Sequence, residues 1–142
     1  MALRHVELKP PISDNFYYEE AIKILRTNIM FSGKDNKVIL FTSTYAAEGK
    51  SSITYSLAVE MGKMKKKVLL LDADIRNSMF MDIHGLPKGI MGLSQYLSGQ
   101  TNGIEEIVLQ TNYKRVHVIN AGPPAPNPVE LLGDSSFEKL IK

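Results

Sequence analysis

The chain has neither cysteine nor tryptophan among its 142 residues. Without cysteine it can form no disulfide, no zinc–thiolate site and no cysteine nucleophile, which fits a reducing compartment. No apolar run approaches the ~20 residues that span a bilayer. The first residues also lack the apolar core of a signal peptide. We therefore expect a cytoplasmic protein that reaches the inner face of the membrane only through a partner.

The chain also has little net charge, formally +2, which is too small to indicate a nucleic-acid partner. Its densest basic cluster comprises Lys63, Lys65, Lys66 and Lys67, just before an apolar run. A solvated helix end is the simpler interpretation of this cluster. A weak attraction to an anionic membrane surface is the alternative.

Apolar periodicity predicts strands alternating with helices, the pattern of an α/β protein. Tyr18, Ile22, Leu25 and Ile29 form one stripe of a helix ending near residue 32, and a second helix covers about 51–64. Buried strands are expected at 38–42, 68–71 and 116–119. Shorter helices are expected at 92–97, 104–109 and 129–132, and from a Ser135-x-x-Glu138 capping box onward. We expect a P-loop NTPase-like parallel sheet flanked by helices over 15–142, preceded by a flexible segment, 1–14.

The segment between the first strand and the second helix is rich in small residues and ends in Gly-Lys-Ser. A strand, such a loop and a helix are the parts of a phosphate-binding P-loop, whose N–H groups and helix N-terminus attract anions. Only one glycine lies in the loop, so an ordinary turn with a chance Gly-Lys-Ser is the alternative. The expected ATP-binding residues are Thr44, Tyr45, Ala46, Ala47, Glu48, Gly49, Lys50, Ser51 and Ser52. Lys50 can reach the β- and γ-phosphates, and the Ser51 hydroxyl can ligate Mg²⁺.

A second group of polar residues follows the strand at 68–71. Asp72, Asp74 and Arg76 stand where ligands bind in open α/β sheets, at the carboxyl end of a strand. If the strand geometry continued, Asp72 and Asp74 would share one side. One carboxylate could hold Mg²⁺ and the other accept a proton, while Arg76 could stabilise the transferring group or pair with a carboxylate. Ordinary strand-end solvation is the alternative.

Several segments resemble the bacterial tyrosine kinases (BY-kinases) of capsule and exopolysaccharide synthesis, in particular the Gram-positive type whose membrane activator is a separate protein. Residues 46–52 are similar to the family's Walker A loop. Residues 71–78, Leu-Asp-Ala-Asp-Ile-Arg-Asn-Ser, are similar to its specific Walker A′ motif. Residues 25–29, 92–99 and 121–132 resemble further family segments.

The resemblance implies ATP-dependent tyrosine phosphorylation, mainly on a neighbouring subunit, with ATP/ADP and Mg²⁺ as cofactors. Lys50, Asp72 and Asp74 would be catalytic, and Ser51, Asp72 and Asp74 would hold the metal. Glu20, Lys23 and Arg26 occupy the places of a family motif that supports a homo-oligomeric ring, with lysine replacing the motif's first arginine. Implied partners are a transmembrane activator of polysaccharide assembly and protein tyrosine substrates, with no nucleic acid.

The family's Walker B strand and tyrosine-rich tail do not occur in this sequence. We therefore expect the N-terminal part of a longer or truncated protein, not fully active by itself. Two other functions fit some of the residues. A P-loop switch ATPase of the partition and cell-division kind would carry an extra lysine early in the loop, where this chain has none. A degenerate, non-catalytic nucleotide-binding regulator would explain the glycine-poor loop.

Overall fold

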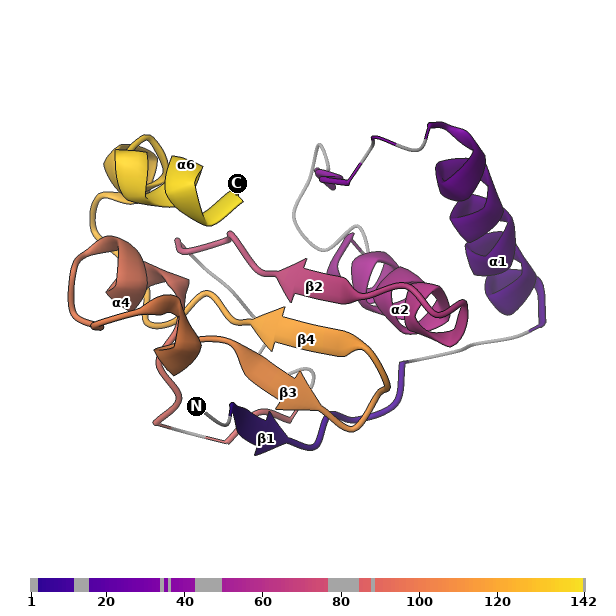
Figure 1. Cartoon of the computed structure of the whole chain (residues 1–142), viewed down its shortest axis with the longest axis horizontal. Coiled ribbons are helices and arrows are strands. Elements are labelled where there is room, and N and C mark those ends of the chain that lie inside the picture. Colours follow the sequence, from indigo (N-terminus) through magenta and orange to yellow (C-terminus); the bar gives the residue numbers. More distant parts are fainter. Residues whose placement is uncertain are drawn as a thin grey trace. The chain divides into compact units, whose positions relative to one another are not determined.

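Figure 1 shows the computed structural model of the chain, which describes residues 3–11, 16–33, 35, 37–42, 50–76, 85–87 and 89–141. The chain divides into two compact units. Unit 1 consists of residues 1–9, 69–112 and 117–142, and unit 2 consists of residues 10–68 and 113–116. Unit 1 holds most of the sheet, and unit 2 holds the two longest described helices.

The described residues form one four-stranded sheet, in the order β1-β3-β4-β2. Its strands are β1 (Arg4–Val6), β2 (Val68–Leu71), β3 (Leu109–Thr111) and β4 (Val116–Ile119). β1 pairs in parallel with β3, whereas β3 pairs antiparallel with β4. β2 lies beside β4 and points the same way in Figure 1. The α/β class is confirmed, but the sheet is mixed, because a short turn can connect β3 to β4 only as antiparallel neighbours.

Two strands were not predicted from the sequence. The segment 1–14 was expected to be flexible, yet Arg4–Val6 is a paired strand, and Val6 and Leu8 are each only 4% exposed. The helix expected at 104–109 is a single 3-10 turn, η1 (Ile104–Glu106), and Leu109 already belongs to β3. Strands of three residues are too short to produce a readable alternation of apolar and polar residues.

The two helices of unit 2 form where the sequence predicts them. They are α1 (Phe16–Phe31) and α2 (Lys50–Lys63), and they lie against one another. The predicted stripe of α1 is confirmed, since Ile22 is buried and its other members are partly buried. In α2, residues 55–59 are all buried, so no single apolar stripe describes this helix.

The strand expected at 38–42 is wrong. Residues 37–42 form no strand, and Val38 and Leu40 are 66% and 85% exposed. An apolar run becomes a strand only where a neighbour pairs with its N–H and C=O groups. Among the described residues, the run 38–42 has no such ladder. β2 forms as predicted but is not covered on both faces, since Leu69 is 46% exposed.

Short helices complete unit 1, namely α4 (Leu93–Leu97), α5 (Pro128–Leu132) and α6 (Ser135–Ile141). They match the expected helices at 92–97, at 129–132 and from Ser135 onward. The cap of α6 differs from the prediction, because the Ser136 N–H donates to Asp134 Oδ1 at 3.4 Å, so Asp134 takes the place expected for Ser135. The core beneath these helices consists of Ile75, Leu93, Leu97, Ile107, Ile119 and Ala121. No helix in the described part of the chain is long and apolar enough to cross a bilayer.

Candidate nucleotide site

The helix expected after the phosphate loop begins where the Gly-Lys-Ser motif places it, since α2 starts at Lys50. The first N–H groups of a helix lack partners within the helix, so this end is suited to an anion. The predicted loop residues Thr44, Tyr45, Ala46, Ala47, Glu48 and Gly49 lie outside the described residues, as do the side chains of Lys50 and Ser51. Ser52 is partly buried. ATP binding by this segment therefore stays a prediction.

The acidic loop, residues 72–76, begins where β2 ends. The Asp72 N–H donates to the Ile119 carbonyl at 2.9 Å and makes the last link between β2 and β4. Strand geometry then stops, because the Asp74 N–H donates to Asp72 Oδ1 at 3.1 Å and the Ile75 N–H donates to the Ala73 carbonyl at 2.9 Å. The sequence placed Asp72 and Asp74 on one side only if the strand continued through them. Because the strand ends at Leu71, that reason for placing them together does not apply. Instead the chain turns around the Asp72 carboxylate.

The acidic loop is anchored through Ile75, which is 1% exposed and belongs to the core of unit 1. Its carbonyl accepts a hydrogen bond of 2.9 Å from the Ala125 N–H. Asp74 and Arg76, its two neighbours, are exposed, and Asp72 is partly buried. A buried apolar anchor between charged residues limits the movement of the loop while its carboxylates and guanidinium stay accessible. This is the arrangement that a metal- or phosphate-contacting loop requires.

Asn120 was missed by the sequence analysis. It follows β4 directly and is completely buried. Its Oδ1 accepts from the Gly122 N–H at 2.9 Å, its Nδ2 donates to the Met91 carbonyl at 3.2 Å, and its own carbonyl accepts from the Leu93 N–H at 2.8 Å. The Ser94 hydroxyl also donates to the Pro123 carbonyl at 2.8 Å. We call Gly92, Ser94, Asn120 and Gly122 the asparagine junction. It fixes the loop whose Ala125 holds the acidic loop.

The only sequence signal for this junction was a polar residue inside an apolar run, Val-Ile-Asn-Ala at 118–121. Buried amides are satisfied by hydrogen bonds, and here donor and acceptor both find backbone partners. The close approach of the backbone at residue 92 to Asn120 and Gly122 also explains why residue 92 is a glycine. A Cβ at Gly92 would lie 2.6 Å from Asn120 Oδ1 and would overlap the Gly122 backbone.

In unit 2, α2 is anchored by Tyr55, whose side chain is 1% exposed. Its ring meets that of Tyr113 edge to face, with centroids 6.1 Å apart. Burial raises the pKa of the Tyr55 hydroxyl well above its usual range, and a hydrogen bond with Tyr113 and the charge on Tyr113 act in the same direction. This hydroxyl therefore stays neutral throughout the physiological pH range.

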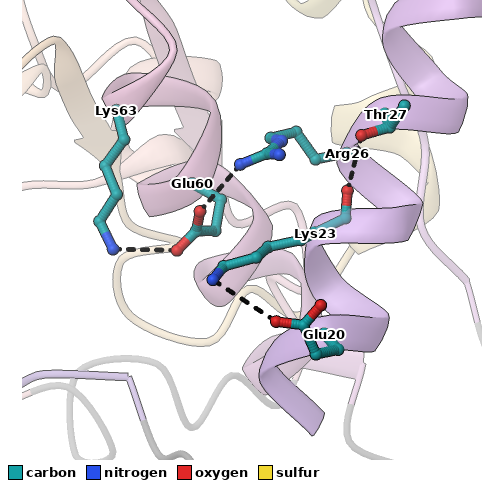
Figure 2. A network of polar contacts seen from close by, with 6 residues as sticks. All are labelled: Glu20, Lys23, Arg26, Thr27, Glu60 and Lys63. Carbon is teal, nitrogen blue, oxygen red and sulfur yellow. Dashed lines mark hydrogen bonds and ion pairs between the residues drawn. The ribbon is translucent and has the colours of Figure 1, made fainter. Parts of the chain in front are cut away.

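The residues expected at an oligomer interface lie on α1 and face different surroundings. Figure 2 shows them beside Glu60 and Lys63 of α2. Glu20 and Lys23 form an ion pair of 3.7 Å, with side chains 44% and 46% exposed. Arg26 instead pairs with Glu60 at 3.2 Å, where both side chains are less than one-fifth exposed, and Lys63 pairs with the other Glu60 oxygen at 2.9 Å. Within one chain, Arg26 therefore joins α1 to α2.

A second contact joins the same two helices. The hydroxyl of Tyr18 lies 3.1 Å from Ser56 Oγ. Tyr18 and Arg26 are eight residues apart on α1, and Ser56 and Glu60 are four apart on α2. The polar contacts thus follow the same side of α1 as the buried Ile22.

Known proteins resemble this chain closely in sequence, although a scan against protein-family profiles finds no match. The chain is 41% identical over 124 residues to the tyrosine-protein kinase CpsD of Streptococcus agalactiae, covering 87% of this chain and 54% of that protein. It is 36% identical to the tyrosine-protein kinase YwqD of Bacillus subtilis, over 85% of this chain and 51% of the relative. It is 33% identical to the putative tyrosine-protein kinase CapB of Staphylococcus aureus, over 96% and 58%.

Solved structures agree with the sequence comparisons. The BceF tyrosine kinase domain superposes with a TM-score of 0.78 at 34% identity, covering 87% of this chain and 49% of that one. The kinase domain of Escherichia coli ETK gives 0.78 at 27% identity, over 87% and 49%. The described fold is that of the bacterial tyrosine-kinase domains. The predicted resemblance to the bacterial tyrosine kinases is confirmed, and the chain spans about half the length of the curated relatives it matches.

Proposed function

We propose that this chain is the nucleotide-binding part of a bacterial protein-tyrosine kinase that regulates capsular or exopolysaccharide synthesis. The observation that carries the proposal is the match to named tyrosine-protein kinases over 87% of the chain, which includes both predicted motifs. The anchored acidic loop supports it, since Asp72 and Asp74 are held on a fixed backbone. The switch ATPase and the non-catalytic regulator are not favoured by these relatives.

In the proposed reaction, a tyrosine hydroxyl oxygen attacks the γ-phosphorus of ATP. The bond from that phosphorus to the β–γ bridging oxygen breaks, and ADP leaves. The phenolic proton passes to a carboxylate of the acidic loop, Asp72 or Asp74. Lys50 neutralises charge on the β- and γ-phosphates, and Arg76 on the transferring group. Ser51, Asp72 and Asp74 are the proposed ligands of Mg²⁺, which would supply further charge neutralisation.

We infer partners and location from the same family. The proposed protein acts at the inner face of the membrane with a transmembrane activator, and it associates with further copies of itself. Solved relatives include the chimerical protein CapA2B2, at 29% identity and a TM-score of 0.75. The exposed Glu20–Lys23 pair can take part in contacts between copies. The Arg26 side chain would first have to leave Glu60.

The test measures phosphotyrosine by mass spectrometry in the full-length protein that carries this sequence, produced with its activator. Lys50→Met should abolish the signal, because Lys50 is the one side chain proposed to reach both the β- and the γ-phosphate. Asp72→Asn should lower it at least 100-fold. Lys37→Met is the matched control at an exposed lysine and should leave it unchanged. A wild-type protein that never gains phosphotyrosine would falsify the proposal.

A further inference from the structure

Two turns of unit 2 form one continuous surface. The first connects α2 to β2 through Met64–Lys67, and the second precedes β4 at 113–115. The Val68 N–H donates to the Arg115 carbonyl at 2.8 Å, and Arg115 Nη1 donates to the Gly62 carbonyl at 3.1 Å. A Cβ on Gly62 would lie 2.7 Å from the Lys114 carbonyl oxygen. The end of α2 and the turn before β4 are therefore in direct contact.

This surface collects positive charge, and we call it the basic patch. Its members are exposed cations: Lys63, Lys65, Lys66, Lys67, Lys114 and Arg115. No aspartate or glutamate occurs in residues 61–68 or 112–116. The nearby Glu60 is already paired with Lys63 and Arg26. Because the whole chain carries only +2, its other charged residues sum to a negative value, and the positive charge is concentrated here.

The backbone of both turns would favour glycine at two of these positions. Lys65 and Arg115 have φ of 63° and 64°, in the left-handed region. α2 ends in a Schellman motif, with the Lys66 N–H donating to the Met61 carbonyl and the Lys65 N–H to the Gly62 carbonyl. A non-glycine residue is disfavoured in this conformation. Cations at a helix C-terminus complement its dipole, but this acts only over the last turn. It does not account for Lys66, Lys67 or Lys114.

The chemistry of the patch favours a lipid surface over a nucleic acid. Met64 is 45% exposed among the lysines, so an apolar side chain is available beside the charges. Such combinations suit the boundary between headgroups and acyl chains. Lysine also predominates over arginine, which suits diffuse attraction more than bidentate recognition. Tyr113, the aromatic residue beside Lys114 in the second turn, packs its ring against Tyr55 and offers bases no platform for stacking.

We propose that the basic patch binds the surface of bilayers that contain anionic phospholipids, so that the chain contacts the membrane directly as well as through a partner. Clusters of four to eight lysines or arginines bind anionic leaflets, with an attraction that salt screens. The proposal does not depend on kinase activity, because it requires neither ATP nor a phosphorylated residue.

The test is co-sedimentation of the chain with vesicles of phosphatidylcholine alone or with 30% phosphatidylglycerol, a composition chosen to give a clearly anionic surface. The chain should bind the anionic vesicles and not the neutral ones, and raising NaCl from 50 to 500 mM should release it. The triple variant Lys65→Gln, Lys66→Gln, Lys67→Gln should bind at least tenfold more weakly. A second variant, Lys66→Gln with Lys114→Gln, leaves both left-handed positions untouched and should lose at least threefold.

The matched control removes three exposed lysines elsewhere, with Lys9→Gln, Lys37→Gln and Lys139→Gln. It loses as much net charge as the triple patch variant and should bind within twofold of the wild type. Equal binding by the patch and control variants would overturn the proposal, as would equal binding to neutral vesicles. Displacement of the chain from vesicles by micromolar duplex DNA would assign the patch to nucleic acid and overturn it as well.

Discussion

The asparagine junction of unit 1 and the charged contacts between α1 and α2 in unit 2 are two polar junctions of opposite kinds. The first is built from uncharged groups around the completely buried Asn120, whose side-chain oxygen and nitrogen both have backbone partners. The second is built from long charged side chains that keep some exposure. A buried amide that loses its partners leaves a desolvated group behind, whereas an exposed charge regains water. The asparagine junction should therefore be much less tolerant of substitution.

The largest effect is expected for Gly92→Ala. The new Cβ would overlap the Gly122 backbone and lie 2.6 Å from Asn120 Oδ1, so backbone must move. We expect a loss of about 3 kcal/mol in the free energy of unfolding, measured by urea denaturation. Gly133→Ala is the control, because its φ is −82° and its nearest contact would be 3.3 Å. Equal losses in the two variants would show that the close approach at Gly92 is not real.

Asn120→Ala should have the next largest effect. It removes the acceptor of the Gly122 N–H and the donor to the Met91 carbonyl, and takes the side-chain partner from both partly buried groups. A loss of about 2 kcal/mol is expected from the same denaturation experiment. Asn102→Ala changes an exposed asparagine and should stay within about 0.5 kcal/mol of the wild type. A tolerant Asn120 would remove the contrast between the two junctions.

A double-mutant cycle of Arg26→Ala and Glu60→Ala tests the charged contacts between α1 and α2. Because both side chains are mostly buried, we expect a coupling of about 1 kcal/mol at 50 mM NaCl. The cycle of Glu20→Ala and Lys23→Ala should give about 0.3 kcal/mol and lose it in 500 mM NaCl. If the exposed pair coupled as strongly as the partly buried one, burial would not be what distinguishes them.

The smallest change in stability at neutral pH is expected for Tyr55→Phe. This variant tests a buried hydroxyl of unit 2 through the pH dependence of stability. Burial raises the pKa of Tyr55 in the folded chain above its unfolded value of about 10. Its contribution to stability is therefore complete below pH 10 and is lost as the pH rises further, because the unfolded chain releases the proton first. Thermal melts between pH 8 and 11 should show a smaller alkaline loss for Tyr55→Phe. Tyr17→Phe, at an 80% exposed ring, should follow the wild type.

The sequence predicted long helices well and short strands poorly, for physical reasons. α1 repeats its apolar pattern over several turns, and α2 starts at the lysine of the predicted motif. β1 and β3 have three residues each, and β1 pairs with β3 across more than 100 residues of sequence, which no local pattern reveals. The run at 38–42 had the composition of a buried strand but lacks a ladder among the described residues.

The candidate site likewise has features that the sequence predicted and features that it did not. The positions of Asp72, Asp74 and Arg76 after β2 followed from the apolar run before them. The turn of the chain around the Asp72 carboxylate could not be predicted from that run. It depends on the hydrogen bond between Ile75 and Ala125, which are 50 residues apart in the chain. Asn120 was not found for the same reason. Its role is defined by Met91 and Gly122, and the sequence shows only an amide in an apolar run.

The pairing of β1 with β3 constrains the order in which this chain can fold. The Leu8 N–H bonds to Asn112 Oδ1, a partner 104 residues later. During synthesis, the first strand must therefore wait until β3 has left the ribosome, and closing so long a loop is entropically unfavourable. We expect β1 to dock last. Until it does, Val6 and Leu8 remain uncovered and open to chaperones.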